Sequence, residues 1–277
     1  MNPDEYCRQK AVPGGSSLYY ALLFLPSERR RAITALYAYC REMEGVIDEC
    51  SDAQLARSKL AWWRLEIGKL FEGKQSHPVA NALRPFMEKF QIRAELLNEI
   101  IDGTEMDLAQ TRYLDFTGLA RYCNQVAGAT GLVAAEILGC RNPRTLEYAR
   151  DLGTAVQLTK IIRDVGVDAR RNRIYLPMDE LKQFEVPAAE ILQLKHSGNF
   201  TKLMAFQARR AESFYDKATG CLPREDRHAQ RAGLIMAALC RATLAEVERD
   251  GFRVLTHRTS LTPLRKFWLA LTTWVST

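Results

Sequence analysis

The chain is patterned for helices almost from end to end, and this constrains its fold more than any other feature. Apolar residues recur at helical spacing with few β-branched alternations, and the breaks fall where Gly and Pro occur. We predict helices near 27–50, 52–72, 78–89, 93–110, 116–138, 144–168, 188–195, 199–219, 226–250 and 261–274. Because no linker or repeat divides the sequence, we expect a single all-α domain over 1–277.

Composition narrows the class of protein. Of the 277 residues, 47% are hydrophobic and 26% charged, as in ordinary globular proteins. The net charge of +6 suits anionic substrates or membrane surfaces and is too small to indicate a nucleic-acid partner. Seven scattered cysteines without a CxxC pair, and a polar start without the pattern of a signal peptide, predict reduced thiols and a cytoplasmic protein. No apolar run is long enough to cross a bilayer.

Two carboxylate pairs stand out, Glu44 with Asp48 and Asp164 with Asp168. Each pair is spaced i, i+4, so both side chains lie on one helix face, and helical projection places that face inward. Buried acids are costly unless a metal ion or a cationic partner neutralises them. If the pairs face each other, they form an oxygen-rich site suited to Mg²⁺ and substrate phosphates. Taken singly, each pair would more often be a solvated helix surface.

Two other stretches leave choices open. The segment 126–135, VAGATGLVAA, is rich in small residues, which indicates either tight helix packing or a cavity that takes a long ligand. Asp102, Glu105 and Asp107 form a further acidic cluster, which we interpret as a solvated helix end.

Two motifs resemble those of the squalene/phytoene synthase family of head-to-head prenyltransferases. The segment 157–177, QLTKIIRDVGVDARRNRIYLP, resembles the family's QLTNIxRDxxEDxxxGRxYLP signature, and 39–49 resembles YxFCRxxDDxxDE. The segments 16–19 and 122–131 agree as well, and the resemblance covers nearly the whole chain. Within the family, the opening residues look most like bacterial presqualene diphosphate synthases of the hopanoid pathway.

The resemblance implies a fold and a set of site residues. The fold would be an isoprenoid-synthase helical bundle around a central cavity, with its two acidic motifs on facing helices. Carried over residue by residue, the metal ligands are Glu44, Asp48, Asp164 and Asp168, and the cofactor is Mg²⁺. The diphosphate-binding residues are Ser16, Arg41, Arg163, Arg173 and Tyr175, and Tyr122 acts in catalysis together with Asp48 and Asp164.

The implied reaction is the Mg²⁺-dependent condensation of two farnesyl diphosphates to presqualene diphosphate. The alternatives are phytoene, dehydrosqualene or squalene synthesis, or a non-catalytic paralogue that binds prenyl diphosphates. Three residues depart from the family pattern: Glu44 and Gly45 replace two Asp, and Lys160 replaces Asn. Lys160 either pairs with Asp164 one turn away, in competition with a metal, or reaches the diphosphate.

The last predicted helix carries basic and aromatic residues: Arg265, Lys266, Phe267, Trp268, Leu269, Leu271 and Trp274. Such a segment either docks on the domain or lies in a membrane interface. The second alternative would make the protein a peripheral one at the inner membrane.

Overall fold

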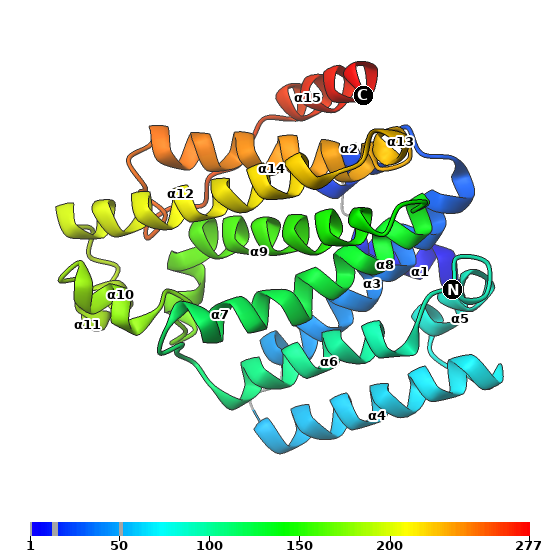
Figure 1. Ribbon diagram of the computed structural model, residues 1–277. Coiled ribbons are helices and arrows are strands. Elements are labelled where there is room, and N and C mark those ends of the chain that lie inside the picture. The colour runs from blue at the N-terminus through cyan, green and yellow to red at the C-terminus, as the bar shows by residue number, and fades with distance from the viewer. Residues whose placement is uncertain (1, 13–15, 50–51) are drawn as a thin grey trace.

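The computed structural model describes residues 2–12, 16–49 and 52–277, which form a helical bundle without β-strands (Figure 1). Its elements are α1 (Pro3–Ala11), α2 (Ser17–Leu22), α3 (Ser27–Glu49), α4 (Ala53–Glu72), α5 (Pro78–Met87), α6 (Ala94–Ala109), α7 (Phe116–Cys123), the π-helix η1 (Asn124–Gly128), α8 (Ala129–Leu138), α9 (Arg144–Arg170), α10 (Met178–Gln183), α11 (Ala188–Leu192), α12 (Gly198–Cys221), α13 (Arg224–Arg227), α14 (Arg231–Arg249) and α15 (Pro263–Ser276).

The all-α prediction is confirmed, and the differences have local causes. The helix predicted over 116–138 contains the π-turn η1 between α7 and α8, which periodicity cannot reveal. The helix predicted over 226–250 is divided between α13 and α14. Helices α1, α2 and α10 were not predicted, because they are nine, six and six residues long and show too few turns for a clear apolar stripe.

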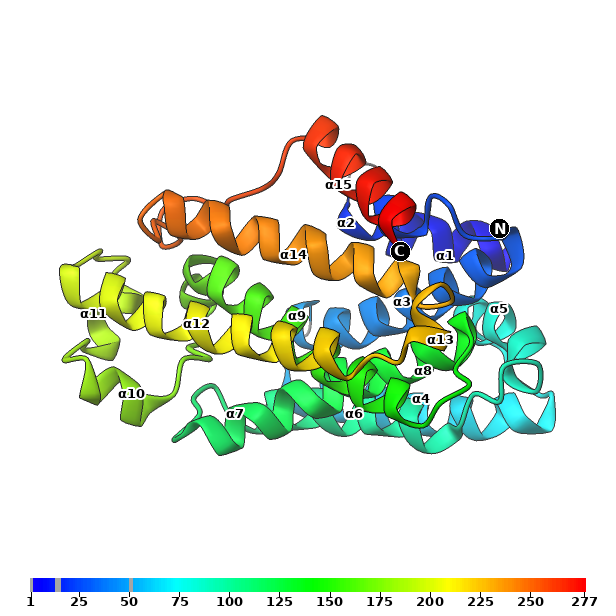
Figure 2. The ribbon, with the colours of Figure 1, turned by 45° about the horizontal axis from the view of Figure 1, so that its top comes forward.

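Helix α9 is the centre of the bundle. It has 27 residues and packs against α12 on one side and against α8 and η1 on another. Figure 2 shows α14 and α15 along one side of the molecule and α4 and α6 along the other. Helix α8 also packs against α3, whereas α3 and α9 do not pack closely on each other. Only long side chains can therefore bridge α3 and α9.

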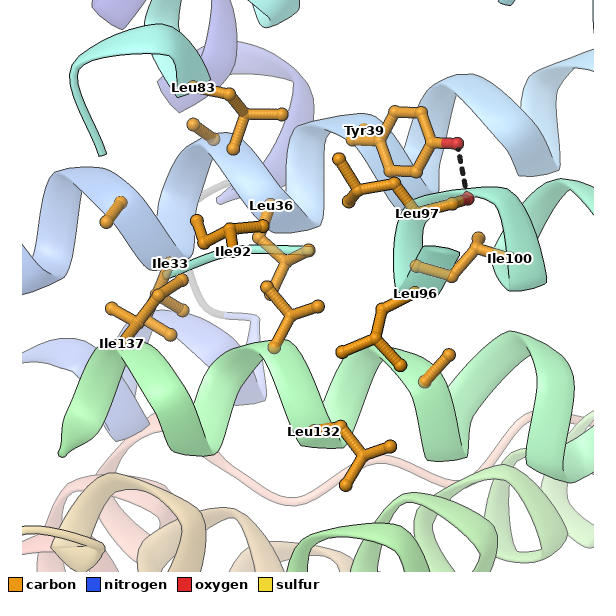
Figure 3. Close-up of a cluster of buried hydrophobic side chains, with 14 of the residues drawn as sticks. Ile33, Leu36, Tyr39, Leu83, Ile92, Leu96, Leu97, Ile100, Leu132 and Ile137 are labelled. Atoms are coloured by element: carbon orange, nitrogen blue, oxygen red, sulfur yellow. Dashed lines mark hydrogen bonds between the residues drawn. The ribbon is translucent and has the colours of Figure 1, made fainter. Parts of the chain in front are cut away.

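A large apolar cluster anchors α3 within the bundle. Figure 3 shows Ile33, Leu36 and Tyr39 of α3 facing apolar side chains of α5, α6 and α8. The Tyr39 hydroxyl donates a 2.9 Å hydrogen bond to the carbonyl of Leu97, so this buried polar atom is satisfied. This packing fixes the orientation of α3 and therefore the position of its acidic carboxyl-terminal end.

The small residues of 126–135 serve close packing. A Cβ added at Gly131 would lie 2.3 Å from the carbonyl oxygen of Ala149, and one at Gly153 would lie 2.2 Å from that of Ala127. Both are backbone atoms that cannot move aside. The two glycines therefore let α8 and η1 approach α9, and of the two alternatives the structure supports tight packing.

A pair of extended segments connects the ends of α6 and α9. An isolated parallel bridge joins Arg112 to Ile174, whose N–H donates to the carbonyl of Thr111 at 3.1 Å. Further along, the N–H of Met178 donates to the carbonyl of Tyr113 at 2.9 Å. This connection brings the residues that follow α9 next to the carboxyl end of α6.

The structure can be compared with two further predictions, that the cysteines are reduced and that no segment crosses a bilayer. The cysteines at 7, 40, 123, 140, 221 and 240 are free thiols, while Cys50 lies outside the described residues. Among the described helices, none combines the length and apolar character that a membrane crossing needs.

Candidate active site

The two acidic motifs face each other across the bundle. Lys160 of α9 places its Nζ 2.6 Å from Oε1 of Glu44 on α3. Arg171, which follows α9, places Nη1 2.5 Å from Oδ1 of Asp48 on α3. Two segments more than a hundred residues apart are thus joined by side chains, in line with the facing acidic motifs that the family resemblance implies.

The acidic stripe of α3 emerges gradually from the core. Ile33 is buried, Tyr37 and Glu44 are half-buried, and Asp48 is exposed. The inward orientation predicted for both pairs is correct for Asp164, which is 6% exposed, and wrong for Asp48. The helical projection was right about the shared face, but it could not show that this face opens to solvent at Asp48, although Val46 on another face is still buried.

Asp164 is held by two arginines. Arg163 donates to its two oxygens at 2.8 and 2.7 Å, and Arg258 at 2.6 and 3.1 Å. Burial alone raises the pKa of this carboxyl, but the two guanidinium groups outweigh burial and lower the pKa to about 2. Asp164 is therefore ionised at neutral pH, with both oxygens occupied.

Asp168 differs from its neighbour one turn away. Its side-chain carboxyl makes no hydrogen bond or ion pair with residues 2–12, 16–49 or 52–277. Burial and the nearby charge of Asp164 raise its pKa to about 7, although Lys160 and Arg171 act in the opposite direction. A carboxylate without a counterion in this position calls for an added cation.

Glu44 has no such need. Its Oε1 accepts from Lys160, and its Oε2 accepts from Arg41 at 2.5 Å. Burial raises the pKa of Glu44, but these two cations bring it below its ordinary value. Within the described residues, no three His, Cys, Asp or Glu side chains are grouped as a ready-made metal site. Asp168 is therefore well suited to bind a divalent ion, because its carboxyl has no counterion in the described part of the chain. Asp48 has one oxygen left for such an ion, and Glu44 is poorly suited, because cations occupy both of its oxygens.

Asp107 of α6 organises two of the predicted diphosphate ligands. It is 5% exposed, and its Oδ1 accepts from Arg173 at 2.7 Å while its Oδ2 accepts from the hydroxyl of Tyr175 at 2.7 Å. Burial raises the pKa of Asp107, partly offset by Arg173. The interpretation of this residue as part of a solvated helix end is wrong. Its position two turns after buried Ile100 could have indicated the inward face.

The other two acids of that cluster behave as predicted. Asp102 and Glu105 both pair with Arg64, at 2.7 and 2.9 Å, and all three side chains are more than a third exposed. Such pairs contribute little to stability. We therefore assign them no part in the site.

Tyr122 lies in a stack of tyrosines beside the π-helix. Its ring is 5.4 Å from that of Tyr175 and 5.6 Å from that of Tyr113. Gln157 donates a long 3.5 Å hydrogen bond to its hydroxyl. Burial raises the pKa of Tyr122 well above its ordinary value, so the phenol keeps its proton at neutral pH. π-Helical turns such as η1, which begins at Asn124, are frequent at functional sites.

Ser16 plays a local role. Its hydroxyl accepts from the N–H of Tyr19 at 3.2 Å and caps α2. No contact of the described residues joins it to the acidic motifs, so diphosphate binding by Ser16 stays a prediction.

A hollow of about 380 Å³ lies between α3 and α4 and is lined by residues including Glu42, Gly45 and Trp62. It contains none of the predicted site residues, so it is not the central cavity that the resemblance implies.

Two arginines of the site were not predicted. Arg171 stands beside Arg170, in a basic run that is ordinary for a helix end. Arg258 lies in the segment between α14 and α15, where no motif marks it. Only the tertiary contacts with Asp48 and Asp164 reveal them.

Known proteins resemble this chain along most of its length. The family model for squalene/phytoene synthase matches residues 12–265. A phytoene synthase from Arthrospira platensis is 32% identical over 270 residues, covering 92% of this chain and 86% of the relative. A 15-cis-phytoene synthase from Synechococcus elongatus is 30% identical over 274 residues, covering 95% and 89%.

Solved structures share the fold. A dehydrosqualene synthase crystallised with a ligand superposes with a TM-score of 0.85 at 24% identity, covering 99% of this chain and 96% of that one. A squalene synthase from Alicyclobacillus acidocaldarius superposes with a TM-score of 0.78 at 23% identity, covering 90% and 94%. The bundle is thus that of the isoprenoid synthases.

Proposed function

We propose that this chain, which belongs to the squalene/phytoene synthase family of prenyltransferases, is a synthase that requires Mg²⁺. It would join two farnesyl diphosphates head to head into presqualene diphosphate. The whole chain, 1–277, would form the single catalytic domain. The observation that carries this proposal is the cross-bundle connection between the two acidic motifs, Lys160 with Glu44 and Arg171 with Asp48.

The cations of the site suit a diphosphate. Arg163, Arg171 and Arg258 now contact carboxylates through long side chains that can turn to another anion. Guanidinium groups bind phosphate oxygens in pairs and stay charged at any physiological pH. An arriving diphosphate would compete with Asp164 and Asp48 for these arginines. The released carboxylates would then be available to a divalent ion.

Each of the remaining residues has a separate task in this proposal. Mg²⁺ would neutralise the leaving diphosphate, and Asp168 with Asp48 would hold the ion. Arg173 and Tyr175, positioned by Asp107, would orient the substrate. The tyrosine stack around Tyr122 would exclude water and offer aromatic surface to an allylic cation.

Proton removal falls to another group. Because Tyr122 keeps its proton, it can donate a hydrogen bond but is a poor base at neutral pH. The released diphosphate is the stronger base, and it would accept the proton when the cyclopropane ring closes.

Geranylgeranyl diphosphate is the alternative to farnesyl diphosphate as the substrate. The solved structures named above are a dehydrosqualene and a squalene synthase, which favours farnesyl chains. The two relatives named above are phytoene synthases, which favours geranylgeranyl chains, one isoprene unit longer. Purified protein should be incubated with Mg²⁺ and each diphosphate, with and without NADPH, and the lipids identified by mass spectrometry.

Each outcome of that incubation is informative. Presqualene diphosphate from the farnesyl substrate alone supports the proposal, and phytoene from the longer substrate replaces it. Squalene only with NADPH, or dehydrosqualene, would assign a later product. No turnover of either substrate by folded protein would leave a paralogue that binds prenyl diphosphates without converting them.

Peripheral membrane contact is a second part of the proposal, because α15 has two faces. Its inner face docks: Ala270 is buried, and the Trp274 ring is 5.3 Å from that of Phe24. Its outer face leaves Leu264 and Trp268 84% and 63% exposed, one turn apart. An apolar stripe of this kind can enter the interface of a bilayer at the cytoplasmic side of the inner membrane.

Sedimentation with anionic lipid vesicles tests this contact. The double variant Leu264→Ser with Trp268→Ser should reduce the bound fraction severalfold. Leu65→Ser, which changes a leucine that is 66% exposed on α4, is the matched control and should bind like the unchanged protein. Equal sedimentation of all three proteins would exclude membrane contact through α15.

A further inference from the structure

Lys160 occupies a central position in the acidic site. Its ammonium is 2.6 Å from Oε1 of Glu44, and it is close enough to Asp168 and Asp107 for its charge to act on both carboxyl groups. This one cation thus contacts an acid of α3 and acts electrostatically on one acid of α6 and one of its own helix, α9.

The same ammonium is open to a ligand. The side chains of Lys160 and Glu44 are 38% and 40% exposed, so solutes can reach the pair. An ammonium has three donors, and Glu44 is the partner of one. The ammonium of Lys160 makes no other hydrogen bond or ion pair with the residues that the structure describes. Two donors are therefore left for phosphate oxygens.

Glu44 fits this arrangement better than it fits a metal. Both of its oxygens are engaged, one by Lys160 and one by Arg41. A divalent ion at Glu44 would have to displace a cation that the chain itself supplies. The extra methylene of Glu, compared with Asp, helps its carboxylate reach the ammonium across α3 and α9, which do not pack closely on each other.

We propose that Lys160 is a built-in cation of this site, which takes the place of a divalent ion at Glu44 and donates directly to the substrate's diphosphate. The inference rests on the proposed function, because it concerns the same diphosphate site. It predicts that the protein binds a diphosphate without any divalent ion. It also predicts that the site takes up fewer divalent ions than a variant without the ammonium.

Calorimetric titration with inorganic diphosphate in the presence of EDTA tests the first prediction. The unchanged protein should bind, Lys160→Met should bind about tenfold more weakly or worse, and Lys160→Arg should retain most of the affinity, because one charge-assisted hydrogen bond is lost only in the first variant. Lys217→Met is the matched control, since it removes a 3.1 Å ion pair with Asp151 of the same helix α9, away from the site. Circular dichroism should show that all four proteins are folded.

Counting bound Mn²⁺ by electron paramagnetic resonance tests the second prediction. In saturating inorganic diphosphate, Lys160→Asn should bind about one Mn²⁺ more per chain than the unchanged protein. Absent binding in EDTA, or equal affinity of the unchanged protein and Lys160→Met, would overturn the diphosphate contact. Equal Mn²⁺ counts would overturn the replacement of an ion.

Neither readout depends on turnover. A protein that converts no prenyl diphosphate, yet binds inorganic diphosphate through Lys160, would contradict the proposed function alone. Turnover together with unchanged binding by Lys160→Met would contradict this inference alone.

Discussion

The two ends of α9 both bury a carboxylate, but they neutralise it in different ways. At the amino end, Asp226 of α13 is 1% exposed and accepts from the hydroxyl of Thr145 at 2.6 Å and from the N–H groups of Arg141 and Asn142 at 3.0 Å each. At the carboxyl end, Asp164 is neutralised by the side chains of Arg163 and Arg258. A helix of this length places the two ends roughly 40 Å apart.

The difference separates a structural acid from an exchangeable one. Backbone donors cannot leave Asp226 without unfolding the turn before α9, whereas arginine side chains can turn from Asp164 to another anion. Glu66 of α4 follows the structural pattern, because it is fully buried and accepts from the N–H groups of Ser76 and His77 at 2.5 and 2.6 Å. We infer that mobility of the counterions, and not burial of the acid, marks the functional end of α9.

Asp168→Asn should have the largest effect on activity and should thereby distinguish the two ends of α9 most clearly. We expect condensation to fall by about a thousandfold, since the carboxylate that would hold the divalent ion is lost, while the fold stays intact. Turnover and urea unfolding measured on one preparation give both values. A variant that loses activity only because it unfolds would assign Asp168 to the structural class with Asp226.

Asp226→Ala should have the opposite profile. It leaves two N–H groups and one hydroxyl without a buried partner, so we expect the free energy of unfolding to fall by about 2–4 kcal/mol. Activity per folded molecule should stay unchanged below the unfolding temperature.

The pH dependence of Asp226 has a defined sign. Burial opposes ionisation, but the donors lower the pKa of Asp226 below its ordinary value of 3.8. Its contribution is present above the unfolded pKa and is lost as pH falls through the folded pKa. The difference in stability between the unchanged protein and Asp226→Ala should therefore shrink below about pH 4.

Asp168 should show the reverse dependence on pH. The pKa of Asp168 is ordinarily 3.8 and rises to about 7 in the folded chain. Between these pH values the folded chain therefore binds more protons than the unfolded chain. Stability must therefore fall as pH rises from about 4 to about 7. Over this pH range, the free energy of unfolding of the unchanged protein should fall by about 1–2 kcal/mol relative to that of Asp168→Asn, a value kept small by partial solvent access. Urea unfolding of both proteins at pH 4.5 and pH 8 measures it, and parallel stability curves would contradict the assignment.

Arg258→Met should have the smallest effect on stability. The arginine side chain is 57% exposed and Arg163 still pairs with Asp164, so we expect a change below about 1 kcal/mol. Substrate affinity should weaken by about tenfold, since one charge-assisted contact to diphosphate is lost. A loss of stability like that of Asp226→Ala would show that the arginines at this end are structural as well.

Much of the site could be predicted, because it lies on local spacing. The i, i+4 pairs of α3 and α9 were recognised as shared faces from the sequence, and Lys160 and Arg163 lie within the same motif as Asp164. Arg171, Arg258 and the buried position of Asp107 were not predicted. Their roles depend on contacts with residues more than sixty positions away, for which no periodicity exists.

The sequence by itself determined the long helices, the faces that carry the acids and the family, since each follows from the order of neighbouring residues. The tertiary structure alone decided which cation neutralises each acid: Lys160 pairs with Glu44 and not with Asp164, and Asp168 pairs with none of the described residues. The physical reason is range. Helix formation and helical faces depend on contacts within a few residues, whereas the partner of a charge depends on which distant helix the packing brings beside it.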